Sequence, residues 1–144
     1  MSLSSLPHGP SFRFIDRVIS LDPGRSGTAE YHIRGDESFL PGHFPGNPIL
    51  PGVILIEMIA QLGGIVAQSD ETIPPLSNLR LTAVSAAKIL GAAVPGETLT
   101  ITATVEGRLG NLIQIYGEVS SSQNPLAKGK LTLSGNEVRS DALS

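Results

Sequence analysis

Apolar and polar residues follow three different patterns along the chain. Residues 26–33 alternate apolar and polar, as a half-buried strand does. Residues 12–21 are mixed and end at Asp22-Pro23-Gly24, a turn signal. These two segments therefore predict a hairpin. Residues 53–68 have apolar side chains around the whole circumference of a helix, which predicts a helix buried on nearly all sides.

The rest of the chain predicts the strands that would cover this helix. Strand-like segments rich in apolar and β-branched residues, separated by glycine and proline, lie at residues 79–90, 97–106, 112–121 and 126–134. Strands of this kind around one helix define an α+β fold, with an antiparallel sheet wrapped around one central helix. We expect residues 1–144 to form a single domain, with the polar residues 136–144 as a disordered tail.

Composition narrows the classes of protein that remain. The formal net charge is -3, so no basic face for nucleic acid is indicated. The absence of cysteine excludes disulfides and thiolate chemistry. The first eleven residues lack the basic start and apolar core of a signal peptide, and Glu57 and Gln61 interrupt the longest apolar run. We expect no membrane span and a cytoplasmic location.

A stiff loop precedes the predicted helix. Residues 38–52 contain four prolines and three glycines, which exclude regular structure and fix the backbone. His43 lies within this loop, and Pro51 stands near the first helical turn, where a missing amide costs little. A loop that is long and rigid indicates a functional segment.

Three residues around the helix start supply the chemistry of an elimination. His43 titrates near neutral pH and is a candidate base, whereas the apolar neighbours of Glu57 favour its protonated form and make it a candidate acid. Gly52 lies at the helix start, where free amide groups stabilise a developing oxyanion. His43, Glu57 and Gly52 are therefore the predicted catalytic residues. Gln61, one turn beyond Glu57, either orients the acid or only packs in the core.

The segment 42–52, GHFPGNPILPG, continued by VILIEMIAQ at 53–61, resembles the β-hydroxyacyl-acyl-carrier-protein dehydratase family. The likeness extends to LPH at residues 6–8, FIDRV at 14–18 and VPGE at 94–97. The resemblance implies the hotdog fold. It also implies dehydration of (3R)-3-hydroxyacyl thioesters on acyl carrier protein to trans-2-enoyl thioesters in fatty acid biosynthesis, by a plain dehydratase with glutamate on the helix.

The resemblance assigns the base to His43, the acid to Glu57 and the oxyanion amide to Gly52. It implies a homodimer in which His43 of one chain faces Glu57 of the other, with a trimer of dimers as the alternative assembly. Candidate substrate-binding residues beside them are Phe44, Pro51, Val53 and Gln61. No cofactor is expected. No metal site is expected either, because His8, His32 and His43 are scattered over unlike elements.

Two alternatives stay open. In one, the chain is a hotdog thioesterase or a hydratase of coenzyme A thioesters; in the other, it is a non-catalytic subunit that binds acyl chains. Residues 79–90 contain only two cations, Arg80 and Lys88, where the family usually has more. This difference leaves open a weak or differently placed contact with an acidic carrier protein.

Overall fold

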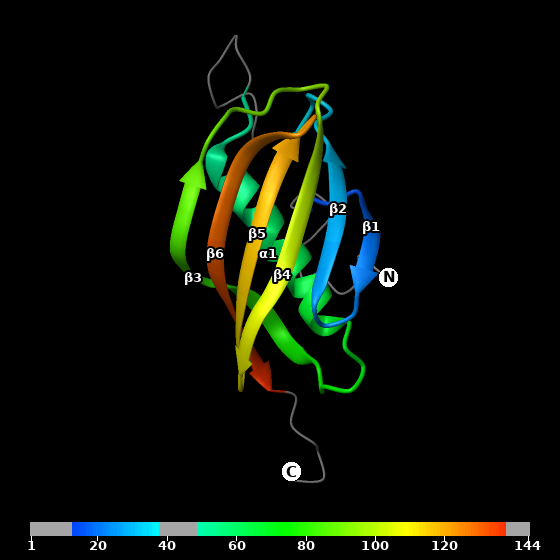
Figure 1. The fold of residues 1–144 in the computed structure, drawn as a ribbon, viewed down its shortest axis with the longest axis vertical. Coiled ribbons are helices and arrows are strands. Elements are labelled where there is room, and N and C mark those ends of the chain that lie inside the picture. Colours follow the sequence, from blue (N-terminus) through cyan, green and yellow to red (C-terminus); the bar gives the residue numbers. More distant parts are fainter. Residues whose placement is uncertain (1–12, 38–48, 138–144) are drawn as a thin grey trace.

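The computed structural model describes residues 13–37 and 49–137, which form one sheet curved around one helix (Figure 1). Neighbouring strands run antiparallel in the order β1-β2-β4-β5-β6-β3. The expected α+β architecture with a central helix, the hotdog arrangement, is therefore confirmed. The elements in chain order are β1 (Arg17–Asp22), β2 (Ser26–His32), α1 (Gly52–Gln68), β3 (Leu76–Ile89), β4 (Thr98–Leu109), β5 (Leu112–Ser121) and β6 (Asn124–Glu137).

The strand bounds confirm most of the sequence pattern and correct it at two places. β5 has the expected bounds, and β3, β4 and β6 overlap their predicted segments. β6 continues to Glu137, so the first two residues of the expected tail at 136–144 belong to a strand, and the others lie outside the described residues. β1 begins only at Arg17. The N–H group of Phe14 bonds to a side chain of α1, and the chain reaches β2 first at Asp16, whose N–H donates to the carbonyl of Glu30.

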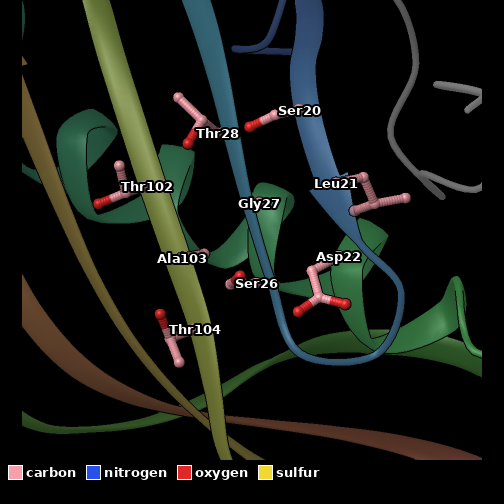
Figure 2. A pocket seen from close by; sticks show the side chains of 9 residues that line it. All are labelled: Ser20, Leu21, Asp22, Ser26, Gly27, Thr28, Thr102, Ala103 and Thr104. Carbon is pink, nitrogen blue, oxygen red and sulfur yellow. The ribbon is translucent and has the colours of Figure 1, made fainter.

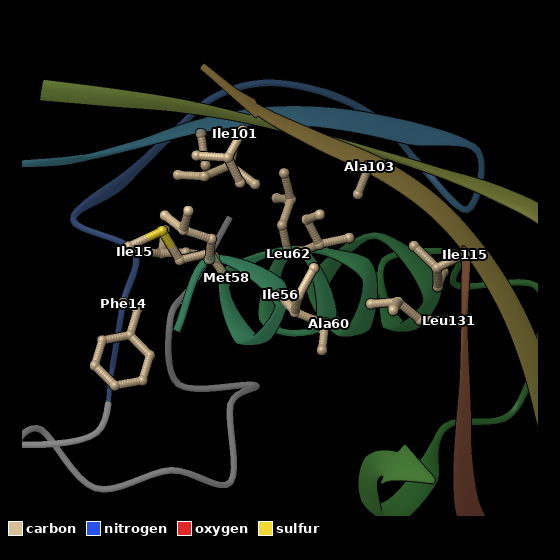
Figure 3. Close-up of a cluster of buried hydrophobic side chains, with 14 of the residues drawn as sticks. Phe14, Ile15, Ile56, Met58, Ala60, Leu62, Ile101, Ala103, Ile115 and Leu131 are labelled. Carbon is tan, nitrogen blue, oxygen red and sulfur yellow. The ribbon is translucent and has the colours of Figure 1, made fainter. Parts of the chain in front are cut away.

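The helix α1 lies on the concave face of the sheet and forms the centre of the core (Figure 3). Twelve of its seventeen residues are buried. The side chains of Met58, Leu62 and Ile101 meet in this core, which excludes water from the helix face toward the sheet. Within residues 13–37 and 49–137 no helix has the length and apolar character needed to span a membrane.

One stripe of α1 is not fully covered. Val53 was expected to be buried, but its side chain is 75% exposed. Glu57, Gly64 and Gln68 are only partly buried and follow Val53 at spacings of four, seven and four residues, which places all four along one side of the helix. The prediction of burial on nearly all sides was wrong along this stripe, because the single curved sheet covers the opposite side.

Two glycines bring the helix and the sheet into close contact. A Cβ on Gly63 of α1 would lie 2.9 Å from two side-chain carbons of Ile115 on β5. A Cβ on Gly117 of β5 would collide with the side chain of Ile59 on α1 and lie 2.6 Å from the carbonyl oxygen of Thr102. Each element therefore offers one glycine to one isoleucine of the other, and neither site accepts a larger side chain without movement.

Candidate active site

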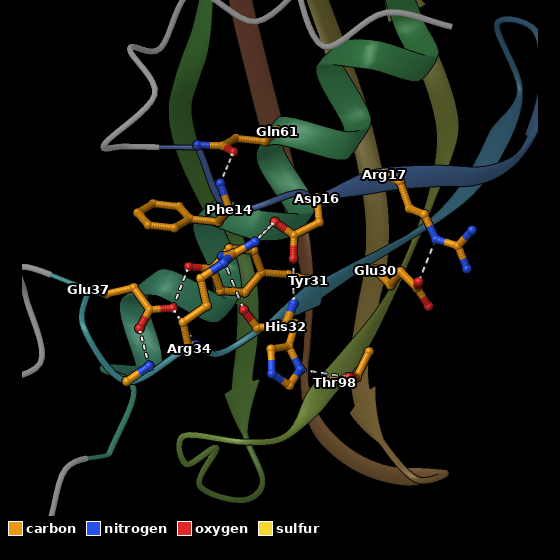
Figure 4. Close-up of polar contacts among 11 residues, drawn as sticks. Phe14, Asp16, Arg17, Glu30, Tyr31, His32, Arg34, Glu37, Gln61 and Thr98 are labelled. Atoms are coloured by element: carbon orange, nitrogen blue, oxygen red, sulfur yellow. Dashed lines mark hydrogen bonds and ion pairs between the residues drawn. The ribbon is translucent and has the colours of Figure 1, made fainter.

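Glu57 and Gln61 lie on consecutive turns of α1 and contact each other. Nε2 of Gln61 donates a hydrogen bond of 3.2 Å to Oε2 of Glu57. The other end of the same amide, Oε1, accepts a 2.8 Å hydrogen bond from the backbone N–H of Phe14 (Figure 4). Gln61 is 1% exposed and Glu57 is half-buried. The structure thus gives Gln61 an orienting contact with the predicted acid, in addition to a place in the core.

The segment before β1 holds this contact in place. The side chain of Phe14 is buried, and its ring meets Tyr31 edge to face with centroids 6.2 Å apart. Phe14 and Gln61 are 47 positions apart, and the sequence did not indicate their contact. The available signal was an uncharged polar residue in the middle of a mostly apolar helix, because a buried amide needs partners.

The start of α1 presents the predicted oxyanion amide. Pro51 precedes the helix and has no side-chain acceptor to cap it, and the first intrahelical bond runs from the N–H of Ile54 to the carbonyl of Pro51, 2.9 Å. The N–H groups of Gly52 and Val53 therefore have no acceptor within the helix. A Cβ on Gly52 would lie 3.2 Å from Cγ1 of Ile89 on β3, so packing as well as chemistry favours glycine here.

His43 and Phe44 lie outside the described residues, as does His8. The chain is anchored on both sides of the segment 38–48. On the far side, Leu50 is buried and its N–H donates a 2.8 Å bond to the carbonyl of Ala93. On the near side, Glu37 accepts hydrogen bonds from the N–H groups of Arg34 and Gly35 and from the hydroxyl of Tyr31 (Figure 4).

Charge and burial strengthen this near anchor. Burial opposes the charged form of Glu37, yet the bonds from the Arg34 N–H and the Tyr31 hydroxyl hold the pKa of its carboxyl below the usual value. Burial, together with the bond to Glu37, raises the pKa of Tyr31. Arg34 also pairs with Asp16 and lies 5.4 Å from the Tyr31 ring centre. Glu37, the last described residue before the segment that contains His43, is therefore held by several hydrogen bonds.

The remaining expected residues are placed as follows. Pro51 is half-buried at the helix start, and Val53 exposes an apolar side chain on the same stripe as Glu57. His32 was predicted to be a surface residue, and it is exposed on β2 with its Nδ1 3.0 Å from the hydroxyl of Thr98. Of the predicted site, the structure therefore brings together Gly52, Val53, Glu57 and Gln61 on one helix.

A separate hollow of about 320 Å³ lies on the outer face of the sheet (Figure 2). Hydroxyl groups dominate its lining, including those of Ser20, Thr28 and Thr102, and α1 lies behind the strands. Serine and threonine hydroxyls are weak nucleophiles unless a base activates them, and the carboxylate in the lining, that of Asp22, pairs with Arg25. The described geometry therefore favours the helix stripe with Glu57 over this hollow as the candidate active site.

An antiparallel sheet wrapped around one central helix defines a protein of the hotdog class. A family model described as a FabA-like domain matches residues 6–127, and the chain belongs to this family. Among curated relatives, a protein of Wolbachia pipientis wMel named 3-hydroxyacyl-[acyl-carrier-protein] dehydratase FabZ is 39% identical over 90% of each chain. A protein of Myxococcus xanthus with the same name is 31% identical over 97% of this chain and 92% of its own.

Solved structures support the fold. The dehydratase heterocomplex ApeI:P from Xenorhabdus doucetiae matches with a TM-score of 0.78 and 20% identity, over 99% of this chain and 95% of that chain. Zebra fish thioesterase superfamily member 2 matches with a TM-score of 0.68 and 18% identity, over 93% and 91% of the two chains. At these identities the likeness shows the hotdog fold alone, which serves more than one reaction.

Proposed function

We propose that this protein dehydrates (3R)-3-hydroxyacyl thioesters bound to acyl carrier protein, giving trans-2-enoyl thioesters in fatty acid biosynthesis. The observation that carries the proposal is the oriented acid: Glu57 is held by Gln61, which Phe14 holds in turn, on the stripe of α1 that the sheet leaves uncovered. The family relatives, named as dehydratases of this type, support the same reaction.

The proposed reaction is an elimination in which atoms and charge balance. His43 removes the proton on the carbon next to the thioester carbonyl. The resulting negative charge develops on the carbonyl oxygen, where the N–H of Gly52 at the positive end of the helix dipole stabilises it. The electron pair returns to form the double bond while the bond to the β-hydroxyl breaks. Glu57 gives its proton to that hydroxyl, which leaves as water.

Gln61 decides which oxygen of Glu57 carries the proton. Its N–H group requires an acceptor, so Oε2 of Glu57 acts as the carbonyl-like oxygen and the proton belongs on Oε1. In the opposite arrangement the amide would have to donate to the hydroxyl oxygen of the acid, which is a weaker acceptor than its carbonyl oxygen. An acid whose proton sits on a fixed oxygen is ready to donate in one direction, which reduces the cost of orienting it during the reaction.

The proposed active unit is a homodimer that completes each site with His43 of one chain and Glu57 of the other. β3 supports this arrangement because it ends the sheet and is 14 residues long, with mostly exposed side chains. A long exposed edge strand offers unpaired backbone groups to a second strand. Sedimentation at working concentration tests the dimer, and an active monomer would contradict it.

The reaction itself is tested with matched substrates. A 3-hydroxyacyl chain on acyl carrier protein should lose one water in mass spectrometry and keep its thioester. Release of free thiol would instead establish a thioesterase. Preference for the coenzyme A thioester would indicate a hydratase of that class, and no turnover of either substrate would favour a non-catalytic subunit. The proposed compartment is the cytoplasm, which cell fractionation tests.

A further inference from the structure

Tyr31 contacts two residues that lie on either side of β2 along the chain. Its side chain is 3% exposed and belongs to β2. Its ring meets the ring of Phe14, with the centroids 6.2 Å apart and the planes at 82°. Its hydroxyl donates a 2.7 Å hydrogen bond to Oε2 of Glu37 (Figure 4). Tyr31 therefore links the segment before β1 to the segment that follows β2.

The contact with Phe14 leads to the predicted acid in two further steps. The backbone N–H of Phe14 donates a 2.8 Å bond to Oε1 of Gln61, and Nε2 of Gln61 donates a 3.2 Å bond to Oε2 of Glu57. Phe14 and Gln61 are each 1% exposed, so their contact lies away from bulk water. The amide satisfies both partners in one orientation only. A displacement of Phe14 would therefore also displace the group that orients Glu57.

Asp16, two residues after Phe14, ties this segment to both neighbours of Tyr31 in β2. The N–H of Asp16 donates a 2.8 Å bond to the carbonyl of Glu30. Its Oδ2 accepts a 2.7 Å bond from the N–H of His32. The backbone close to Phe14 is thus fixed to β2, and Tyr31 supplies the ring against which the Phe14 side chain packs.

The hydroxyl distinguishes Tyr31 from a core residue that only fills space. The carboxylate of Glu37 that accepts it also accepts the N–H groups of Arg34 at 2.9 Å and Gly35 at 2.7 Å. Burial and the bond to Glu37 raise the pKa of Tyr31, so the hydroxyl remains a donor. The guanidinium of Arg34 lies 5.4 Å from the ring centre, within the range of a cation–π contact. The ring is therefore held at its tip by a charge-assisted bond and over its face by a cation.

We propose that Tyr31 is a positioning residue for the acid Glu57. It acts through Phe14 and Gln61 and contacts no reacting atom. This inference rests on the proposed function, because it names a residue that supports the proposed acid. A group that donates a proton in the transition state has to keep its geometry, so a small shift of the ring changes the rate more than the binding of the substrate.

The test removes the hydroxyl of Tyr31 and keeps its ring. In Tyr31→Phe we expect kcat for a 3-hydroxyacyl pantetheine thioester to fall about three- to tenfold, less than the roughly 10²-fold that a displacement of about 1 Å can cost. KM should stay nearly constant, because the lost bond to Glu37 stabilises neither the bound substrate nor the free enzyme selectively. This substrate also excludes effects on the binding of a carrier protein.

A matched control and a second substitution show whether the effect passes through Gln61. Tyr116→Phe removes the other tyrosine hydroxyl of the chain, which also bonds to a glutamate, Glu118, at 2.8 Å, and should leave kcat and KM unchanged. In Gln61→Leu the donor to Glu57 is already lost, so adding Tyr31→Phe should lower kcat by less than about twofold more. An equal loss in the two tyrosine variants would overturn the inference. So would losses that multiply, because they would mean that Tyr31 acts by another route.

Hydrogen exchange separates this inference from the proposed function. Exchange of the Phe14 N–H, followed by nuclear magnetic resonance, reports its bond to Gln61 whether or not a substrate turns over. It should be faster in Tyr31→Phe than in Tyr116→Phe or the unchanged protein, while amides between β4 and β5 exchange equally in all three. Unchanged exchange at Phe14, or faster exchange with an unchanged kcat, would overturn the inference. An unchanged protein that dehydrates no thioester would refute the proposed function, and faster exchange would still support the link from Tyr31 to Gln61.

Discussion

Nε2 of Gln61 donates a hydrogen bond of 3.2 Å to Oε2 of Glu57, one helical turn earlier. The amide cannot turn over without cost, because its oxygen accepts the backbone N–H of Phe14 at 2.8 Å. A flipped amide would put two donors face to face at Phe14 and two acceptors face to face at Glu57. The orientation of the predicted acid is thus linked to the chain segment that precedes β1.

Replacing Gln61 should change the reaction more than the binding. In Gln61→Leu we expect kcat to fall and KM to stay nearly constant, because Glu57 keeps its place but loses its donor. The alkaline limb of the pH profile of kcat should move to higher pH, since a carboxyl without that donor holds its proton more tightly. The variant also removes the Gln61 acceptor of the bond from the Phe14 N–H, at a cost of about 1–3 kcal/mol in unfolding free energy. A loss of stability with an unmoved pH profile would reduce Gln61 to a packing residue.

The two groups that move protons should each be indispensable. His43→Ala and Glu57→Gln are each expected to reduce kcat by roughly 10²–10⁴-fold, the range for loss of a general acid or base. Circular dichroism and thermal unfolding should show an intact fold, because glutamine keeps the volume of Glu57 and because a side chain from the predicted loop, such as His43, is expected to contribute little to the core. Near-normal turnover in either variant would contradict the assigned role.

Mixing the two inactive variants tests whether the site is shared. If His43 and Glu57 act across a dimer, random subunit exchange makes about half of the dimers heterodimers, each with one intact site. Activity should then approach roughly a quarter of the wild-type value, provided that the sites act independently. Exchange must first be demonstrated with differently tagged chains. Complete exchange without recovered activity would place both residues in one chain.

Gly52→Ala separates the chemical role of this glycine from its packing role. The added methyl group would lie 3.2 Å from Cγ1 of Ile89, so part of any effect is crowding. Ile89→Ala in the same chain removes that crowding. We expect Gly52→Ala to lower kcat/KM and the second substitution not to restore it, because the methyl group also blocks the approach of a carbonyl. Full recovery in the double variant would show that Gly52 serves packing alone.

Gly117→Ala should destabilise the fold. Its Cβ would collide with Ile59 and lie 2.6 Å from the carbonyl oxygen of Thr102, and overpacking of this kind costs about 1–3 kcal/mol. Gly107→Ala is the control: its Cβ would have no neighbour closer than 4.0 Å, and the unfolding free energy should change by less than about 0.5 kcal/mol. Denaturant melts of both variants give the two values, and equal stability would contradict the close fit.

The hydrophobic pattern predicted the architecture because it reports which faces of each element are buried. The apolar run at 53–68 became α1, and the segment 112–121 became β5. The pattern failed at Val53, because apolar character alone does not reveal which side of a helix the sheet leaves open. The pattern also did not predict that β1 starts late. Phe14 is a residue type common in strands, but its N–H bonds to Gln61 of the helix.

Contacts between distant positions were beyond prediction from a single chain. Lys88 and Lys128 are 40 positions apart, and only the register between β3 and β6 brings them together. The bond between Phe14 and Gln61 likewise depends on where the first segment crosses the helix. Residue type and local spacing were enough to propose chemical roles for Gly52 and Glu57. The contacts around each residue could be described only from the folded structure.

Gly63 and Gly117 contribute to the position of the helix that carries Glu57, the proposed acid. Ile115 packs against Gly63 and Ile59 packs against Gly117, and this close fit at two points opposes sliding or rotation of α1 against β5. The position of Glu57 therefore depends on the packing of α1 against β5 as well as on the helix itself. Substitutions at these glycines that keep the protein folded would shift the acid relative to the substrate, and would resemble active-site variants although they contact no reacting atom.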